Sequence, residues 1–123
     1  MIHRMTVKQP YFSMLENGTK TVELRLYDEK REKIRPSDVI EFTCADDESK
    51  RFAVFVRGLY RAADFNSLLF LITPEMAGFE KASDLLSTLK QFYSEDKQKK
   101  YGVVGILVEQ LNALTPEFFY DQA

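Results

Sequence analysis

A chain of 123 residues has the length of one ordinary domain, and its content of 45% hydrophobic and 29% charged residues is typical of a globular protein. No apolar run is long enough for a membrane span, and residues 1–10 lack the apolar centre of a secretory signal, so we expect a cytoplasmic protein that does not enter the membrane. The net charge of −2 argues against a protein that coats nucleic acid through bulk positive charge.

The first part of the chain predicts a strand followed by a short helix. Residues 3–9 alternate between apolar and polar side chains, as a strand with one buried face does. Pro10 suits the first turn of a helix, and Gly18 can adopt the left-handed conformation that ends one. We therefore predict a helix from about residue 10 to residue 17.

Residues 19–27 predict a second strand, with one apolar face. That face repeats at the strand period of two and consists of Val22, Leu24 and Leu26. A charged connector follows over residues 28–38 and ends in three turn-forming residues, Pro36, Ser37 and Asp38. The turn delivers the chain into the next strand.

Two more strands are predicted, over residues 39–44 and 51–62. The polar residues 45–50 between them are typical of a hairpin loop. Gly58 interrupts the second of these strands and indicates a β-bulge or a bend. We therefore expect a hairpin with an irregular second strand.

From Asp64 onward the apolar residues follow the helical period instead. Asp64 or Asn66 is the candidate cap of a first helix, and Thr73 precedes a proline in the pattern of a second short helical turn. Ser83 is the candidate cap of a clearer helix over residues 84–93. The side chains that this helix turns inward are predicted to be Leu85, Leu86, Leu89 and Phe92.

The C-terminal part of the chain predicts a loop and a last strand. Residues 97–102 are basic and typical of a solvated loop, whereas residues 101–111 form a nearly continuous apolar run, the pattern of a strand buried on both faces. Gly105 in this run leaves room for a bend or for a close neighbour. The last residues carry three aromatic side chains, which either pack on the core or form a partner surface: Phe118, Phe119 and Tyr120.

About five strands interrupted by short helices, without the alternation of a βαβ fold, predict an α+β domain. The architecture we expect is a small, mixed, largely antiparallel β-barrel with flanking short helices. The sequence contains no internal repeat or low-complexity tract, and we expect residues 1–123 to form a single domain.

Few residues are available for metal binding or for histidine-dependent catalysis. Cys44 is the only cysteine and His3 the only histidine, which excludes an internal disulfide and a zinc site of the usual Cys/His spacing. A Ser-His-Asp or Cys-His mechanism would have to use His3, close to the N-terminus. We therefore predict neither a metal nor a cofactor.

The strand over residues 19–27 carries an unexpected set of charges for a strand with a buried face. Glu23 and Arg25 leave the same face at i and i+2, close enough for an ion pair, and Lys20 lies at the start of the strand. A carboxylate between two cations orients both, so that the arginine offers a planar fork to a phosphate or a base edge and the lysine a movable positive charge. The alternative is an exposed Glu23–Arg25 pair with a solvated lysine, which is a common and weak interaction.

The charges are unevenly distributed along the chain. Residues 1–35 hold eight Lys or Arg against five Asp or Glu, whereas residues 36–123 hold nine against fourteen. An anionic ligand should therefore meet the N-terminal third of the chain. Scattered surface ion pairs are the alternative explanation for this asymmetry.

Two segments of the sequence resemble the signature of the ASCH domain family. The first reads GTKTVELR and matches the pattern Gly-x-Lys-x-x-Glu-x-Arg, and the second reads IRPSDVIEF and matches the turn and strand that follow it. The matching residues are Gly18, Lys20, Glu23, Arg25, Pro36 and Asp38. Ser37 stands where the family usually has a glycine. The order of elements, up to the apolar strand that begins at residue 101, is also similar over most of the chain.

The resemblance implies a PUA-like β-barrel, a fold associated with RNA binding, with a cleft beside the barrel. In that cleft Lys20 and Arg25 would contact a phosphate or a nucleobase of RNA or of a nucleoside- or nucleotide-like ligand. Glu23 would orient the two cations or accept a hydrogen bond from the ligand. Aromatic side chains near the cleft could stack on a base, and the candidates by position are Tyr11, Phe12 and Tyr27.

The resemblance also implies an alternative, because some small ASCH-like proteins are amidohydrolases that act on acetylated cytidine and others are ribonucleases. The amidohydrolases carry a threonine nucleophile three residues after the lysine, where this sequence has Glu23. A hydrolase would therefore need Lys20 as a base, or Glu23 to activate water. Weaker candidates for such a site are Thr21, Glu75 and Glu80. A third hypothesis is a protein-interaction domain that uses residues 118–120.

Overall fold

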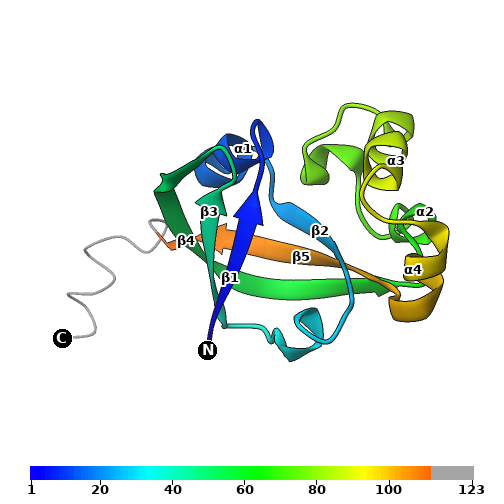
Figure 1. Cartoon of the computed structure of the whole chain (residues 1–123), viewed down its shortest axis with the longest axis horizontal. Coiled ribbons are helices and arrows are strands. Elements are labelled where there is room, and N and C mark those ends of the chain that lie inside the picture. Colours follow the sequence, from blue (N-terminus) through cyan, green and yellow to red (C-terminus); the bar gives the residue numbers. More distant parts are fainter. Residues whose placement is uncertain (112–123) are drawn as a thin grey trace.

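A computed structural model gives the structure of this protein and describes residues 1–111. Within them, five strands form one curled sheet, a half-barrel with short helices around it (Figure 1). The strands are β1 (Ile2–Val7), β2 (Val22–Leu26), β3 (Val39–Cys44), β4 (Asp47–Ala62) and β5 (Val103–Gln110). The helices are α1 (Tyr11–Asn17), α2 (Phe65–Leu68), α3 (Ala82–Lys90) and α4 (Glu95–Tyr101), with 3-10 helices η1 (Arg31–Lys33) and η2 (Pro74–Ala77).

The sheet order is β1-β3-β4-β5-β2, so β1 and β2 are its two edges. β1 and β3 are parallel, whereas the other neighbouring strands are antiparallel. This topology confirms the predicted α+β fold, a mixed and largely antiparallel barrel with flanking short helices. The register between β4 and β5 shifts at Gly58, which confirms the predicted bulge. β5 lies between β4 and β2, and its first residues are buried on both faces, as the apolar run predicts.

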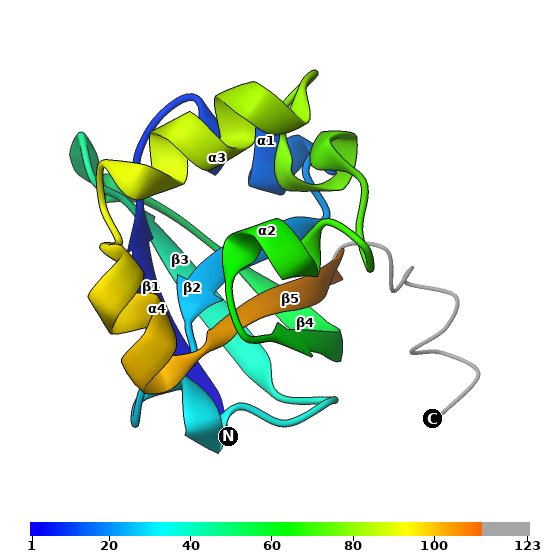
Figure 2. The ribbon, with the colours of Figure 1, turned by 90° about the vertical axis from the view of Figure 1, so that its right-hand side faces the viewer.

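The core consists of two clusters of buried side chains. The first packs α1 against β1, β3, β4 and β5 around Phe12 and Phe42. The second packs β2 against α2, η2 and α3 around Phe65 and Leu85. Figure 2 shows α2 in front of β2 and β5, with α3 running across the top of the molecule. β2 is therefore largely buried on both faces although it is an edge strand.

The helix that follows β4 is shorter than its periodicity predicts. α2 ends at Leu68, although Asp64 caps it as predicted by accepting a hydrogen bond from the backbone N of Ser67. Ile72 is buried without being helical, so the apolar spacing reports burial rather than a continuous helix. Thr73 caps η2, as predicted.

The helix α3 begins earlier than predicted, with Lys81 rather than Ser83 at its cap position. The prediction of an inward Phe92 is wrong, because the helix ends at Lys90 and leaves this side chain half exposed. The other predicted inward residues are buried or partly buried: Leu85, Leu86 and Leu89.

Most of residues 97–102 belong to the helix α4, so the prediction of a loop is wrong. Ser94 caps this helix by accepting a hydrogen bond from the backbone N of Lys97. Acidic residues in its first turn and lysines in its last turn complement the helix dipole. Gln98 is buried and accepts a hydrogen bond from the backbone N of Phe65, which anchors α4 to α2. This helix was not predicted because its buried residue is a glutamine and its sequence has no apolar stripe.

The loop between β3 and β4 is also shorter than predicted. β4 begins at Asp47, so the turn consists of residues 45–46. Residues 47–50 pair as a strand but are exposed, which removes the apolar alternation by which a strand is recognised.

No helix within residues 1–111 meets the requirements of a membrane span. The longest, α3, has nine residues, whereas a span takes about 20 apolar ones. The aromatic segment at residues 118–120 lies outside the described residues, so its role stays a prediction.

Ser37, in the turn before β3, has a φ of 76°, the left-handed region that favours glycine. Its backbone N donates to the O of Val56 at 2.8 Å, a contact that does not need the side chain. The left-handed conformation costs an L residue roughly 1–2 kcal/mol, and glycine removes that cost. The larger unfolded-state entropy of glycine offsets part of the resulting gain in stability. We therefore expect Ser37→Gly to raise the free energy of unfolding, measured by urea denaturation, by about 0.5–1 kcal/mol.

The matched control is Ser87→Gly, which places the same change inside the helix α3. Glycine is unfavourable there, so the free energy of unfolding should fall by about 0.5–1 kcal/mol. A fall of similar size in both variants would contradict the assignment of backbone strain to Ser37.

Candidate functional site

Lys20, Glu23 and Arg25 come together at the edge strand β2, and we call them the charged cluster. Glu23 lies between the two cations, with Oε1 3.4 Å from Lys20 Nζ and Oε2 2.7 Å from Arg25 Nη2. Arg25 Nε also donates to Oε2 at 2.8 Å. The side chains of Lys20, Glu23 and Arg25 are 4%, 8% and 15% exposed, so the alternative of an exposed ion pair with a solvated lysine is wrong.

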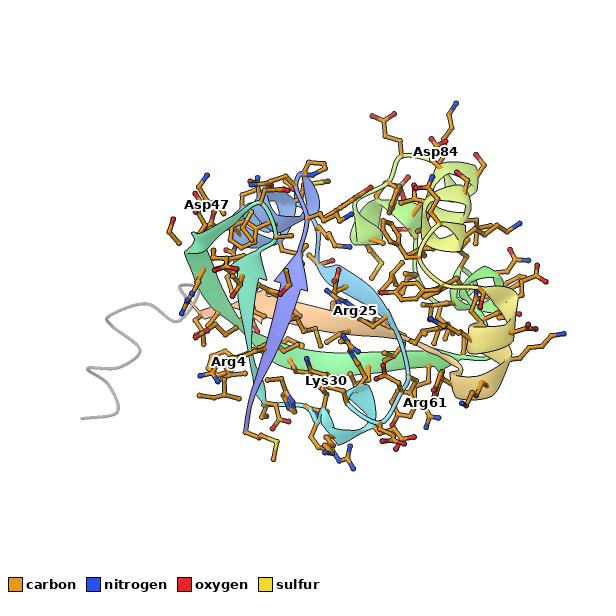
Figure 3. All side chains as sticks on the ribbon, viewed as in Figure 1. Arg4, Arg25, Lys30, Asp47, Arg61 and Asp84 are labelled. Atoms are coloured by element: carbon orange, nitrogen blue, oxygen red, sulfur yellow. The ribbon has the colours of Figure 1, made fainter. Side chains whose placement is uncertain are left out.

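The fold buries the charged cluster between the two edges of the sheet. Val22 and Leu24 pack in the second core cluster, which turns Glu23 and Arg25 to the opposite face of β2. Arg25 Nη2 donates to the backbone O of Thr6 in β1 at 2.9 Å (Figure 3 labels this arginine). β1 and β2 are the edges of the curled sheet and are not paired with each other. The arginine therefore links the open edges of the half-barrel through its side chain.

Lys20 is held in place by its neighbours rather than free to move. Nζ donates to the backbone O of Val22 at 2.9 Å and of Ala77 at 2.8 Å, in addition to its contact with Glu23. An ammonium group has three N–H donors, so these contacts account for all of them. The expectation that Lys20 offers a movable positive charge is therefore wrong. The lysine instead ties β2 to η2, the 3-10 helix that contains Ala77.

Arg25 has hydrogen-bond donors that no other residue within 1–111 uses. Within residues 1–111 its hydrogen bonds come from Nε and Nη2, which leaves the two N–H groups of Nη1. The guanidinium is planar and rigid, so Glu23 and Thr6 fix the direction of Nη1 as well. The contacts of Arg25 with Glu23 and Thr6 therefore set the direction of this donor edge.

The members of the charged cluster act on one another's pKa. Burial alone would raise the pKa of the Glu23 carboxyl, but the charges of Arg25 and Lys20 outweigh it and hold this pKa below its usual range. Burial also works against the charge of Arg25, yet Glu23 raises the pKa of the guanidinium above its ordinary value. For Lys20, burial wins and lowers the pKa of the ammonium, although Glu23 partly offsets it. The pKa shifts thus favour the charged forms of Glu23 and Arg25 and disfavour the charged form of Lys20.

A cleft of about 210 Å³ is lined by the charged cluster. Its other walls come from the end of β1, from α1 and from the segment that includes α3. Four aromatic rings line it: Tyr11, Phe79, Phe92 and Tyr93. The ring centroids of Tyr11 and Phe79 are 5.4 Å apart, and those of Phe92 and Tyr93 are 6.4 Å apart. The cleft therefore combines a charged patch with two pairs of aromatic side chains.

Of the three stacking candidates from the sequence, Tyr11 lines the cleft. Phe12 is a core residue, 1% exposed. Tyr27 does not line the cleft, and its ring centroid lies 3.9 Å from Arg61 Cζ. The other three aromatic residues of the cleft were not predicted from the sequence, because the helical spacing of residues 65–93 does not show that this segment folds against β2.

The weaker catalytic candidates lie away from the cleft. Its lining includes neither Thr21 nor Glu75 nor Glu80.

His3 is buried in β1, where its Nε2 lies 2.8 Å from Asp38 Oδ2. The histidine therefore links β1 to the turn before β3.

Comparison with known proteins places the chain among its relatives. The ASCH domain family model matches residues 5–112. The crystal structure of the hypothetical protein PH0355 is 34% identical with a TM-score of 0.80, covering 90% of this chain and 100% of that chain. The solution structure of PF0455 from Pyrococcus furiosus is 32% identical with a TM-score of 0.72, covering 91% and 99%.

A more distant structure shows the same fold. A mutant of ZmASCH from Zymomonas mobilis is 12% identical with a TM-score of 0.65, covering 89% of this chain and 69% of that chain. At this identity the likeness concerns the fold alone. None of the curated proteins matches the chain.

Proposed function

Because the chain belongs to the ASCH domain family, whose fold is PUA-like, we propose that it binds RNA or a nucleoside- or nucleotide-like ligand in the cleft beside the charged cluster. The observation that carries this proposal is Arg25, which lines a cleft with aromatic rings and has two N–H donors, those of Nη1, without a partner within residues 1–111. A nucleobase suits both features, since it has acceptor atoms on its edge and a face on which rings stack. Lys20 and Glu23 are positioning residues in this proposal, because their contacts fix the arginine and the wall around it.

The size of the cleft favours a small or single-stranded ligand. A volume of about 210 Å³ has room for roughly one base and is below the range of pockets that enclose larger molecules. The net charge of −2 also provides no broad attraction for a duplex. We therefore infer that the ligand is a single nucleotide unit, or a single strand that inserts one base.

Calorimetric titration of the protein with the four ribonucleosides, N4-acetylcytidine and a short single-stranded RNA tests this proposal. We expect at least one probe to bind, and Arg25→Lys to weaken its binding by about tenfold, because lysine keeps the charge but not the planar donor edge. Circular dichroism should show that the variant is folded.

The matched control for this variant is Arg57→Lys. Arg57 is 64% exposed and forms a surface pair with Glu109 at 3.0 Å. The same exchange there should leave the affinity unchanged. The proposal fails if no probe binds the unaltered protein, or if folded Arg25→Lys binds as tightly as the unaltered protein does.

A second candidate function is hydrolysis of an acylated nucleoside or of RNA. The observation that favours it is the pKa of Lys20, which burial lowers toward the range in which an amine acts as a base. Chromatography of N4-acetylcytidine and of RNA after incubation separates the two functions. Product formed by the unaltered protein but not by Lys20→Met would support hydrolysis. Binding without product would support a binding module.

A further inference from the structure

The cleft has a local excess of positive charge, although the chain as a whole is acidic. Three cations and one carboxylate line it. Two of the cations, Lys20 and Arg25, are paired with the carboxylate of Glu23. The third is Lys8, directly after β1, and within residues 1–111 its ammonium takes part in neither a salt bridge nor a hydrogen bond. Its charge is therefore free for a ligand.

Lys8 is exposed where the end of β1 faces the residues that follow α3 across the cleft. Its Nζ lies 5.1 Å from the ring centroid of Phe92, which is half exposed and lines the same cleft. A cation–π contact at an exposed position is weak, and it uses the face of the ring rather than an acceptor atom. The contact therefore keeps the ammonium beside the cleft and leaves its three N–H donors for an anion.

The buried part of the cleft is a poor place for a phosphate. The carboxylate of Glu23 would repel it, and the donors of Lys20 already point to protein oxygens. The exposed ammonium of Lys8 meets neither obstacle. A ligand that carries both a base and a phosphate can therefore bind both regions at once. Its base would lie beside Arg25 and its phosphate beside the exposed ammonium of Lys8.

We propose that Lys8 binds a phosphate group of the nucleotide whose base occupies the cleft, so that the site prefers a nucleotide to the corresponding nucleoside. This inference rests on the proposed function. The ligand chemistry is a phosphate ester, which is either the terminal phosphate of a free nucleotide or the backbone phosphate of RNA. The flexible stem of lysine suits a group outside the cleft, where the phosphate stays largely hydrated.

Calorimetric titration with each ribonucleoside, its 5′-monophosphate and a dinucleotide with one internal phosphodiester tests this assignment. The unaltered protein should bind the phosphorylated form about three- to tenfold more tightly than the nucleoside, as one exposed charge-assisted contact allows. Lys8→Met keeps most of the unbranched side chain but removes the ammonium, and it should bring that ratio to about one, with the nucleoside affinity unchanged. Lys50→Met removes an exposed lysine of β4 that does not line the cleft and should leave the ratio as it is.

The outcomes separate this inference from the function on which it rests. If Lys8→Met abolishes a preference for the monophosphate, and the dinucleotide shows no preference over the nucleoside, the site binds a terminal phosphate. If the dinucleotide is also preferred and Lys8→Met abolishes that preference equally, the site binds an RNA backbone phosphate. Nucleoside binding with no phosphate preference, or with a preference that survives Lys8→Met, overturns the role of Lys8 and leaves the proposed function standing. Absence of binding by every probe overturns both.

Discussion

Glu23→Gln is expected to lower the free energy of unfolding by about 3–5 kcal/mol at neutral pH, because it removes one partner of a buried ion pair. The amide is nearly the same size as the carboxylate but carries no charge. It therefore leaves Lys20 and Arg25, whose side chains are 4% and 15% exposed, without their counter-charge. Urea denaturation followed by circular dichroism measures the change.

A control variant at an exposed ion pair identifies the cause of that loss. Glu41→Gln removes a carboxylate that lies 3.6 Å from Arg4 Nε, in a pair whose arginine is 79% exposed. This control should cost no more than about 0.5 kcal/mol. Equal losses in the two variants would contradict the burial of the charged cluster.

The loss caused by Glu23→Gln should also depend on pH. Burial already lowers the pKa of Lys20 from 10.5, and Glu23 is the charge that opposes this effect, so the folded-state pKa of Lys20 should be lower in the variant than in the unaltered protein. Stability is then gained as the pH rises from the lowered folded-state pKa toward the unfolded value. We therefore expect the deficit to be smaller at about pH 9.5 than at pH 7. A deficit that grows over this range would contradict the assignment to Lys20.

Gly105→Val is expected to lower the free energy of unfolding by about 3 kcal/mol through overpacking. A Cβ at this position would lie 3.0 Å from Val22 Cγ1 and 3.5 Å from a methyl group of Leu24 and of Leu68. The valine must therefore push β2 away from β5 or force these side chains from their preferred rotamers. Because Glu23 lies between Val22 and Leu24, affinity for the cleft ligand should fall as well. Denaturation and calorimetry measure the two effects.

Gly58→Val provides the matched control, because a Cβ added there meets no atom within 4 Å. We expect this substitution to change the free energy of unfolding by less than about 0.5 kcal/mol and to leave ligand affinity as it was. If Gly58→Val lowered the free energy of unfolding as much as Gly105→Val does, the loss could not be assigned to overpacking. Gly58 would then be required by the bulge in β4.

Much of the sheet could be predicted because its signals are local. Strand periodicity predicts β2 and β3, and a continuous apolar run predicts β5. Of the two roles predicted for Gly105, a bend or room for a close neighbour, the structure shows the close neighbour. The charged cluster was also visible, because residues at i and i+2 on a strand share a face, as Glu23 and Arg25 do. The departure from the family pattern at Ser37 has a structural counterpart in its positive φ.

The environment of the charged cluster could not be predicted in the same way, because it depends on residues far away in sequence. Lys20 is held by the backbone O of Ala77, and Arg25 by that of Thr6. Backbone carbonyls carry no sequence signal, so a lysine that looks free in the sequence is fixed in the fold. The aromatic walls have the same origin, since Phe79 reaches the cleft only when η2 packs against β2.

The most direct test of a ligand site at the charged cluster follows the arginine side-chain ¹⁵N signals by NMR during titration with the nucleotide that binds best. We expect the Arg25 Nε and Nη signals to shift in proportion to occupancy and those of the exposed Arg57 to stay in place. Saturating binding that leaves the Arg25 signals unmoved while other arginines respond would contradict a ligand site at the charged cluster.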